Sequence, residues 1–197
     1  MTAGDTARRA LVIETLATTA RLHAALADGP AVEAIARAGE TLVRVLAAGG
    51  QVLAFGNGGS AADAQHFVAE LVGRFERARR GFPAVALTTD PSIVTAAAND
   101  FGFEAVFARQ VEALGRAGDL AVGITTSGNS PNVVRGLEAA KARGLRTIAL
   151  TGNDGGAAGR LAEVHVNVPA AVTARVQEAH MTVLHLLCAF VDREVEG

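Results

Sequence analysis

Tryptophan and tyrosine are absent from the 197 residues of the sequence, and cysteine occurs once, as Cys188. One thiol cannot form a disulfide within the chain, and its apolar helical surroundings predict a buried side chain in a reducing compartment. No stretch approaches the roughly 18 apolar residues of a membrane-spanning helix, and the first residues lack the pattern of a cleavable leader. We therefore expect a cytoplasmic protein without membrane contact.

An excess of positive charge is also lacking, since the sequence has 18 basic and 20 acidic residues and a formal net charge of -2. Proteins that bind nucleic acid usually carry a basic surface, so no nucleic-acid partner is expected. Residues 74–80 form the one basic cluster. This cluster is interpreted either as a solvated loop or as a surface that guides an anionic substrate.

The sequence does contain a regular alternation of strand and helix patterns. Helices are predicted at 6–27, 31–48, 61–75, 92–98, 104–114, 131–143, 157–161 and 173–195, and strands at 52–56, 84–88, 120–125, 147–151 and 164–168. Such alternation predicts an α/β protein with a parallel sheet covered on both faces and ligands bound beyond the carboxyl ends of its strands. We expect one domain over 1–197, with a helical pair at 1–50 packed against the C-terminal helix and an α/β core with its closing helix at 51–197.

A glycine-rich turn, 56–60, joins the first predicted strand to a helix. Such a turn presents backbone N–H groups to a phosphate. The same helix carries His66 and Glu70 about one turn apart on one face, which suits a metal ion or proton transfer. The turn also fits the dinucleotide pattern G-x-G-x-x-A, but no acidic residue follows at the required distance, and a Walker A motif is absent.

Two further loops follow neighbouring predicted strands. Residues 125–131 combine several hydroxyl side chains with a glycine before a helix, and 151–156 are rich in glycine, asparagine and aspartate. A single cluster of this kind is usually a helix cap or a turn, and a turn alone is the alternative interpretation of the second loop. Two such loops on neighbouring strands favour a phosphate site.

The closing helix carries Gln177, His180 and His185. A histidine on an apolar helix is usually a core residue, but Gln177 and His185 could join His66 and Glu70 as ligands of a zinc-like ion. Gln177 and His185 are eight residues apart, about 12 Å along a helix. Either both side chains stretch toward one ion, or neighbouring subunits complete each site. We favour the shared site.

Four motifs carry a resemblance to a known family, and they occur at 56–66, 99–102, 126–130 and 177–180. In this order they resemble the phosphoheptose isomerases of the sugar-isomerase (SIS) family, over nearly the whole chain. The resemblance implies a homotetramer of five-stranded parallel α/β subunits, with N- and C-terminal helices in a central bundle and active sites at subunit contacts. It also implies conversion of sedoheptulose 7-phosphate to D-glycero-D-manno-heptose 7-phosphate through an enediol, for lipopolysaccharide or other surface polysaccharide.

The resemblance also implies the site residues. Glu70 and His185 would be the catalytic proton-transfer pair, and one zinc ion per subunit would be bound by His66, Glu70, Gln177 and His185. Substrate binding is implied for Asn57, Gly58, Gly59, Ser60, Glu70, Asn99, Asp100, Thr125, Thr126, Ser127, Ser130 and Gln177.

Two alternatives to an enzyme remain. The SIS family also contains a regulator without enzymatic activity that binds a replication-initiator protein and is similar to this chain at 60–75 and 175–178. In that branch the positions of Glu70 and His185 hold other residues, so their presence here favours the enzyme. Sugar-phosphate sensing without turnover is the other alternative. Ala174 departs from the acidic residue of some isomerases, which leaves the local substrate contacts open.

Overall fold

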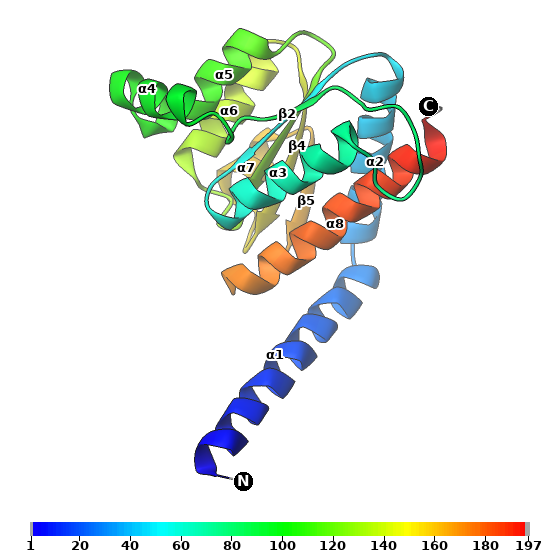
Figure 1. Ribbon diagram of the computed structural model, residues 1–197, viewed down its shortest axis with the longest axis vertical. Helices are drawn as coiled ribbons and strands as arrows, with labels where there is room; N and C mark the ends of the chain where they lie inside the picture. The colour runs from blue at the N-terminus through cyan, green and yellow to red at the C-terminus, as the bar shows by residue number, and fades with distance from the viewer. Residues whose placement is uncertain (1, 196–197) are drawn as a thin grey trace.

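The computed structural model describes residues 2–195 and has a five-stranded parallel sheet between two layers of helices (Figure 1). The strand order is β2-β1-β3-β4-β5. The strands are β1 Val52–Gly56, β2 Ala84–Ala86, β3 Leu120–Thr125, β4 Arg146–Gly152 and β5 Val164–Val168. The helices are α1 Ala3–Ala27, α2 Ala31–Ala47, α3 Gly59–Val72, α4 Pro91–Phe101, the 3-10 turn η1 Phe103–Ala105, α5 Val106–Leu114, α6 Pro131–Ala142, α7 Gly156–Leu161 and α8 Thr173–Glu194.

Every helix and strand expected from the sequence is present, and the α/β class is confirmed. The errors lie at the ends of elements. Helix α3 begins two residues earlier than predicted and stops at Val72, because Gly73 follows. Strand β2 ends at Ala86, two residues early, where the side chain of Thr89 donates a hydrogen bond to the carbonyl of Ala86 and the chain turns toward α4. The helix predicted at 104–114 is divided into η1 and α5.

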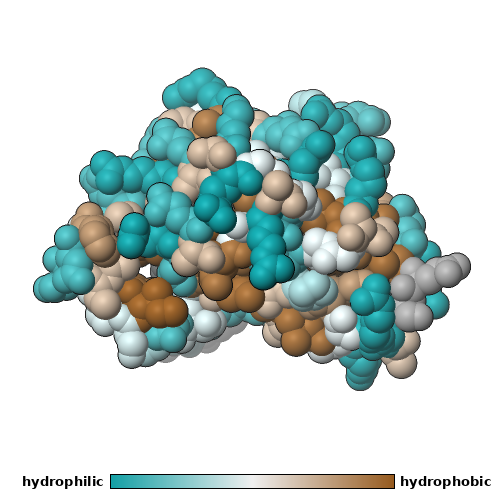
Figure 2. Space-filling model, turned by 90° about the horizontal axis from the view of Figure 1, so that it is seen from above, coloured by the Kyte–Doolittle hydropathy of each residue, from teal (hydrophilic) through white to brown (hydrophobic). Residues whose placement is uncertain are grey.

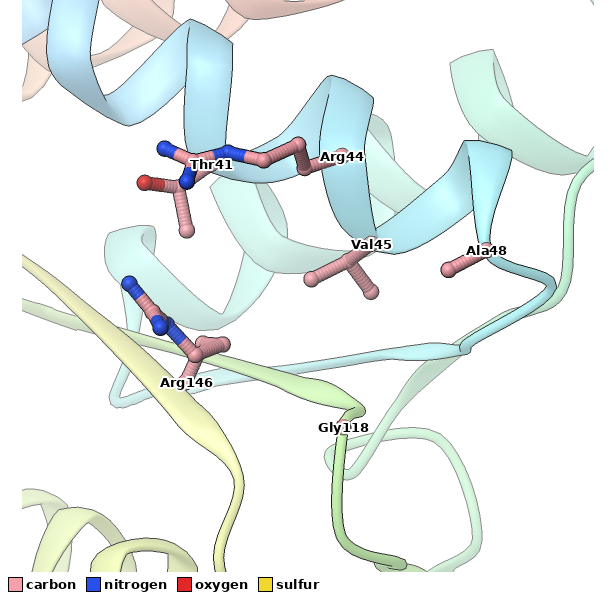
Figure 3. A pocket seen from close by; sticks show the side chains of 6 residues that line it. All are labelled: Thr41, Arg44, Val45, Ala48, Gly118 and Arg146. Atoms are coloured by element: carbon pink, nitrogen blue, oxygen red, sulfur yellow. The ribbon is translucent and has the colours of Figure 1, made fainter.

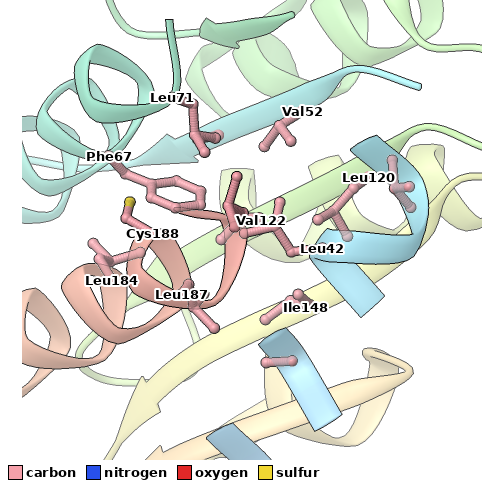
Figure 4. Close-up of a cluster of buried hydrophobic side chains, with 14 of the residues drawn as sticks. Leu42, Val52, Phe67, Leu71, Leu120, Val122, Ile148, Leu184, Leu187 and Cys188 are labelled. Atoms are coloured by element: carbon pink, nitrogen blue, oxygen red, sulfur yellow. The ribbon is translucent and has the colours of Figure 1, made fainter. Parts of the chain in front are cut away.

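The two faces of the sheet carry two hydrophobic clusters. Helices α2, α3 and α8 cover one face, and α4 to α7 cover the other. Figure 4 shows Phe67 of α3 and Cys188 of α8 meeting above the central strands. Cys188 is fully buried, and burial raises the pKa of its thiol to about 12. The interpretation of Cys188 as a core residue is confirmed.

Helices α3 and α8 run in the same direction, side by side, across one face (Figure 1). Gln177 of α8 lies against Gly59 at the start of α3, and His185 lies against His66 further along both helices. The two helices are therefore in register. This register brings the first and fourth sequence motifs, at 56–66 and 177–180, together.

The segment after α3 folds back onto the end of α8. The Asp192 carboxylate accepts hydrogen bonds from the backbone N–H groups of Glu76 and Arg77, both at 2.9 Å, and from Nε of Arg79 at 2.7 Å. The side chains of Arg79 and Asp192 are 5% and 4% exposed. Arg79 also donates to the carbonyl of Glu70 at 2.8 Å. Both interpretations of the basic cluster are therefore wrong for Arg79, which is a buried structural residue.

Helix α1 extends away from the rest of the molecule (Figure 1). Its second half is joined to α8, where Thr19 donates to Glu178 at 2.9 Å and His23 lies 3.0 Å from the hydroxyl of Thr182. Nearer its N-terminus, α1 exposes Leu11, Val12, Ile13 and Leu16 to between 56% and 66%. Seen from above, the molecule has hydrophobic residues in separate groups among hydrophilic ones (Figure 2). Within residues 2–195, no helix is long and apolar enough to cross a membrane.

Candidate active site

A cavity of about 310 Å³ opens at the carboxyl ends of β1 and β3. One wall is the turn after β1, the other is the loop after β3, and the start of α8 closes the third side. The lining residues are Asn57, Gly58, Gly59, Ser60, Ile124, Thr125, Thr126, Ser130, Thr173 and Gln177. Most of the residues predicted to bind substrate are therefore brought to one place.

The glycines of the first wall are required by the backbone and by Gln177. Gly58 has φ of 56°, a conformation that side chains with a Cβ rarely adopt. A Cβ on Gly59 would lie within 2.8 Å of the amide group of Gln177. Gly58, Gly59 and Ser60 at the start of α3 line the cavity, so the positive end of the helix dipole faces it, and no side chain among residues 2–195 caps this end.

The second wall carries hydroxyl groups. The Thr125 hydroxyl lies 2.9 Å from that of Ser130 and 3.3 Å from that of Ser127. Ser127 accepts a hydrogen bond from the backbone N–H of Asn129 at 3.1 Å and is exposed outside the lining set. Helix α6 begins here, with Ser130 at its N-cap and Pro131 in its first turn. Hydroxyl donors and two helix N-termini around one cavity suit a phosphate group.

The loop 151–156 supports this wall rather than lining the cavity. The side-chain amide of Asn153 donates to the carbonyl of Thr126 at 3.0 Å. The backbone N–H of Ala157 donates to the side chain of Asn129 at 2.9 Å, and that of Ala158 donates to the carbonyl of Gly128 at the same distance. The alternative of a turn is therefore correct for this loop.

His66, Glu70 and His185 form a second group further along the helix pair. Nε2 of His66 lies 3.0 Å from Nε2 of His185 and 3.2 Å from Oε1 of Glu70. The ring of His185 also packs on Phe75, with centroids 5.5 Å apart. Glu70 and His185 are thus assembled around His66 within one chain. The parallel register of α3 and α8 explains this arrangement, and the sharing of each site between subunits stays a prediction.

A family model for the SIS domain matches residues 17–152. The phosphoheptose isomerase of Citrifermentans bemidjiense is 56% identical over 162 residues, which are 82% of this chain and 84% of that protein. The structure of phosphoheptose isomerase GmhA from Neisseria gonorrhoeae has a TM-score of 0.88 and 46% identity, covering 94% of this chain and 98% of that one. A phosphoheptose isomerase structure from Francisella tularensis also has a TM-score of 0.88, with 37% identity and coverage of 98% and 100%.

The chain belongs to the phosphoheptose isomerases of the SIS-domain family. This confirms the resemblance drawn from the four sequence motifs. It also agrees with the five-stranded parallel sheet, since both solved phosphoheptose isomerases match the fold over nearly the whole chain.

The zinc ion expected from the phosphoheptose isomerase resemblance can be tested against the side chains present. Histidine nitrogens and carboxylate oxygens are ordinary zinc ligands, so His66, Glu70 and His185 are of the right chemical kind. Gln177, the fourth predicted ligand, packs on Gly59 instead. Within residues 2–195, no group of three or more His, Cys, Asp or Glu side chains has the arrangement of a metal site. The predicted ligands are of a chemical kind that suits zinc, but one chain brings together only His66, Glu70 and His185 and leaves Gln177 apart.

Asp63 is a residue of this region to which the sequence analysis assigned no role. Its side chain is buried, and Oδ2 has no hydrogen-bond partner among the described residues. Burial raises the pKa of Asp63 to about 6, although the nearby His66 opposes this shift. The available signal was a carboxylate three residues before His66, on the face of α3 that also carries Phe67.

His180 is a core residue, as its apolar surroundings predict. It is fully buried, and Nε2 lies 3.0 Å from the carbonyl of Thr151. Burial lowers the pKa of His180 to about 4, so the ring is neutral at pH 7.

Asn99 and Asp100 are predicted substrate contacts that lie outside the cavity lining, as Ser127 and Glu70 also do. Both are exposed on α4, and the amide of Asn99 donates to the Asp100 carboxylate at 2.8 Å. Neither belongs to the lining set of the cavity. Their role in phosphoheptose isomerisation stays a prediction.

Another cavity, of about 170 Å³, lies at the amino ends of β3 and β4 (Figure 3). It is lined by Thr41, Arg44, Val45, Ala48, Gly118 and Arg146. Each arginine is already paired, Arg44 with Glu40 at 3.1 Å and Arg146 with Glu163. The carboxyl-end cavity is therefore the better candidate for an anionic sugar.

Proposed function

We propose that this chain is an aldose-ketose isomerase that converts sedoheptulose 7-phosphate to D-glycero-D-manno-heptose 7-phosphate. The observation that carries the proposal is the placement of an anion cavity and the Glu70–His185 pair along one pair of helices. Gly59 at the cavity and His66 in the pair are separated by about 10 Å along α3 at 1.5 Å per residue. This span suits an extended seven-carbon sugar phosphate. The product would supply the heptose of lipopolysaccharide or another surface polysaccharide.

The proposed reaction moves one proton between neighbouring carbons of the sugar. Glu70 takes a proton from C1, and the carbonyl oxygen at C2 receives a proton from His185, which gives an enediol. His185 then takes the proton of the O1 hydroxyl, while Glu70 returns its proton to C2. The aldehyde forms, and both side chains regain their starting protonation states. The hydroxyl loop and the two helix N-termini hold the phosphate during these steps.

We propose zinc as the cofactor, bound by His66, Glu70 and His185, with Gln177 from a neighbouring subunit as the fourth ligand, because Gln177 of the same chain lies against Gly59. A bound zinc ion would polarise the sugar carbonyl and stabilise negative charge on its oxygen. The donor types support this proposal. Zinc content measured by mass spectrometry should fall in His66→Ala relative to the parent, independently of any activity.

The proposed activity is tested by incubating the purified protein with sedoheptulose 7-phosphate in heavy water and following the sugar by NMR. Conversion to the aldose with deuterium at C2 is expected, because an enediol exchanges its proton with solvent. Absence of conversion both with added zinc and after chelation would overturn the proposal. It would favour either the replication-initiator regulator or the sugar-phosphate sensor. Neither has support from the phosphoheptose isomerase relatives.

We propose a homotetramer with α1, α2 and α8 in its central contacts. Exposed apolar residues on α1 support it, since an isolated helix gains most of its stability from packing. An apolar cavity of about 390 Å³ between the three helices, lined by His23, Leu26, Ala27, Val32, Ile35, Ala36, Ala179, Thr182, Val183, Leu186 and Phe190, also supports it. Native mass spectrometry tests the number of subunits. The cytoplasmic location stays a prediction.

A further inference from the structure

Asn132 lies in the first turn of α6, behind the wall of the candidate phosphate cavity. Its side chain is buried, with 2% of the residue exposed, and it is not part of the cavity lining. Its Nδ2 donates to Oδ1 of Asn57 at 2.8 Å, and Nδ2 of Asn57 donates to Oδ1 of Asn132 at 2.8 Å. The two amides thus form a closed reciprocal pair across 75 residues of sequence.

This amide pair connects the two walls of the cavity. Asn57 belongs to the glycine turn that starts α3, where its carbonyl accepts the N–H of Ser60 at 3.0 Å. Asn132 follows Ser130, the N-cap of α6 in the hydroxyl loop. A buried hydrogen-bonded pair in a medium of low polarity holds its partners at a fixed separation.

The orientation of the Asn132 amide is fixed by a third bond. Its Oδ1 also accepts the backbone N–H of Val133 at 3.0 Å, so Nδ2 is the group that faces Oδ1 of Asn57. A carboxylate at this position would keep the bond to Val133 but would place an oxygen against an oxygen. The site therefore requires an amide rather than any polar side chain of this size.

We propose that Asn132 is a positioning residue that sets the separation of the two walls of the sugar-phosphate cavity. This inference rests on the proposed function, because it takes the cavity to be the phosphate end of the substrate site. Two helix N-termini attract one anion most strongly when their spacing matches it. Without the amide pair, the walls separate in the free protein, and part of the binding energy is used to bring them together.

Kinetics of Asn132→Asp and Asn132→Ala test this role, with Val133→Ala as the matched control in the same turn. KM for sedoheptulose 7-phosphate should rise about tenfold in both variants while kcat changes by less than about threefold, because the reacting carbons lie at the other end of the sugar. The inhibition constant of inorganic phosphate should rise by a similar factor. Asn132→Ala adds no negative charge, so a rise shared by both variants is not simple repulsion.

The control separates positioning from stability. Val133 is fully buried in the same helix, and Val133→Ala should lower the melting temperature without changing KM. If both Asn132 variants keep KM within about twofold of the parent well below their melting temperatures, or if Val133→Ala changes KM equally, the role is structural and the proposal is wrong.

A double-mutant cycle tests whether Asn132 acts through Asn57. Asn132→Ala added to Asn57→Ala should raise KM by less than about twofold, because the pair is already broken. Effects that multiply instead would overturn the proposal. If the parent itself shows no turnover, the proposed activity fails first. Calorimetry with inorganic phosphate on the same variants then still tests the cavity.

Discussion

The buried aspartates at the two ends of the α3 and α8 pair differ in their hydrogen bonding. At the end away from the cavity, Asp192 accepts hydrogen bonds from two backbone N–H groups and from Arg79. Toward the cavity, Asp63 is also buried, yet its Oδ2 lacks a partner among residues 2–195. Nδ1 of the buried His180 also has no hydrogen-bond partner among these residues. The satisfied end fixes the helices, and the end near the proposed chemistry retains polar groups that stability alone would not favour.

The pKa of Asp63 is raised and that of Asp192 is lowered, because the hydrogen bonds available to the two carboxylates differ. Burial raises the pKa of both carboxyl groups, and at Asp63 it dominates. At Asp192 the N–H groups of Arg77 and Glu76 and the Arg79 guanidinium outweigh burial, and the pKa of Asp192 lies below its usual value. Asp192 therefore stabilises the fold when ionised, whereas Asp63 opposes folding when ionised.

The largest expected effect concerns the chemistry near the cavity. Glu70→Gln should lower kcat by about 10²- to 10⁴-fold, because an amide cannot accept the proton of C1. Thermal stability should change little, since the Glu70 side chain is partly exposed. The matched control is Glu76→Gln, a carboxylate at the far end of the pair, which should keep parental kcat. A Glu70→Gln enzyme with kcat within tenfold of the parent would remove Glu70 from the mechanism.

The next effect concerns stability at the satisfied end. Asp192→Ala leaves the buried Arg79 charge without its partner and should destabilise the protein by about 3–5 kcal/mol, measured by urea unfolding at one fixed protein concentration. Arg79→Met combined with Asp192→Ala should recover part of this loss, because no buried charge remains. A loss below about 1 kcal/mol would mean that this end is not the anchor of the helix pair.

A smaller effect of opposite sign is expected at Asp63. Its raised pKa means that the favourable contribution of the protonated form is complete below about pH 4 and is lost as pH rises toward about 6. Asp63→Asn should therefore stabilise the protein at pH 7 by about 1–2 kcal/mol and flatten its melting temperature between pH 4 and pH 6. An Asn variant no more stable than the parent at pH 7 would show that Asp63 has a partner in solution.

Sequence patterns predicted the elements and the glycine and hydroxyl loops because these depend on residues close together in the chain. The buried runs at 52–56 and 120–125 act locally. Gly73 also acts locally by ending α3 at Val72, but the predicted helix ran past it to residue 75. The cavity followed from one general rule, since loops after neighbouring parallel strands meet at one edge of a sheet.

Contacts between distant segments were not predictable in the same way. The register of α3 with α8, which joins His66 to His185 in one chain, depends on how two helices pack on the sheet. The burial of Arg79 required knowing that α8 ends beside the segment after α3. Helical spacing alone placed Gln177 and His185 on one helix, but it could not show that they face different groups on α3.

The smallest expected effect concerns Asn153, which supports the cavity from outside. It is the one non-glycine residue with positive φ within the described residues, at 53°, and its side chain holds the carbonyl of Thr126. Asn153→Gly keeps the backbone conformation and removes only the side-chain bond. Because this bond is exposed, KM should rise only about two- to threefold with little change in melting temperature.

Asn153→Ala is the matched control for this last prediction. Alanine removes the same bond but tolerates positive φ poorly, so it should show the KM of the glycine variant together with a loss of about 1 kcal/mol in stability. If the two variants have equal KM values but different melting temperatures, the lost bond to Thr126 accounts for the change in KM, and backbone strain accounts for the change in stability. If KM stays at the parental value in both, Asn153 serves the turn alone. The support of the cavity wall must then come from the backbone N–H groups of Ala157 and Ala158, which donate to the side chain of Asn129 and the carbonyl of Gly128.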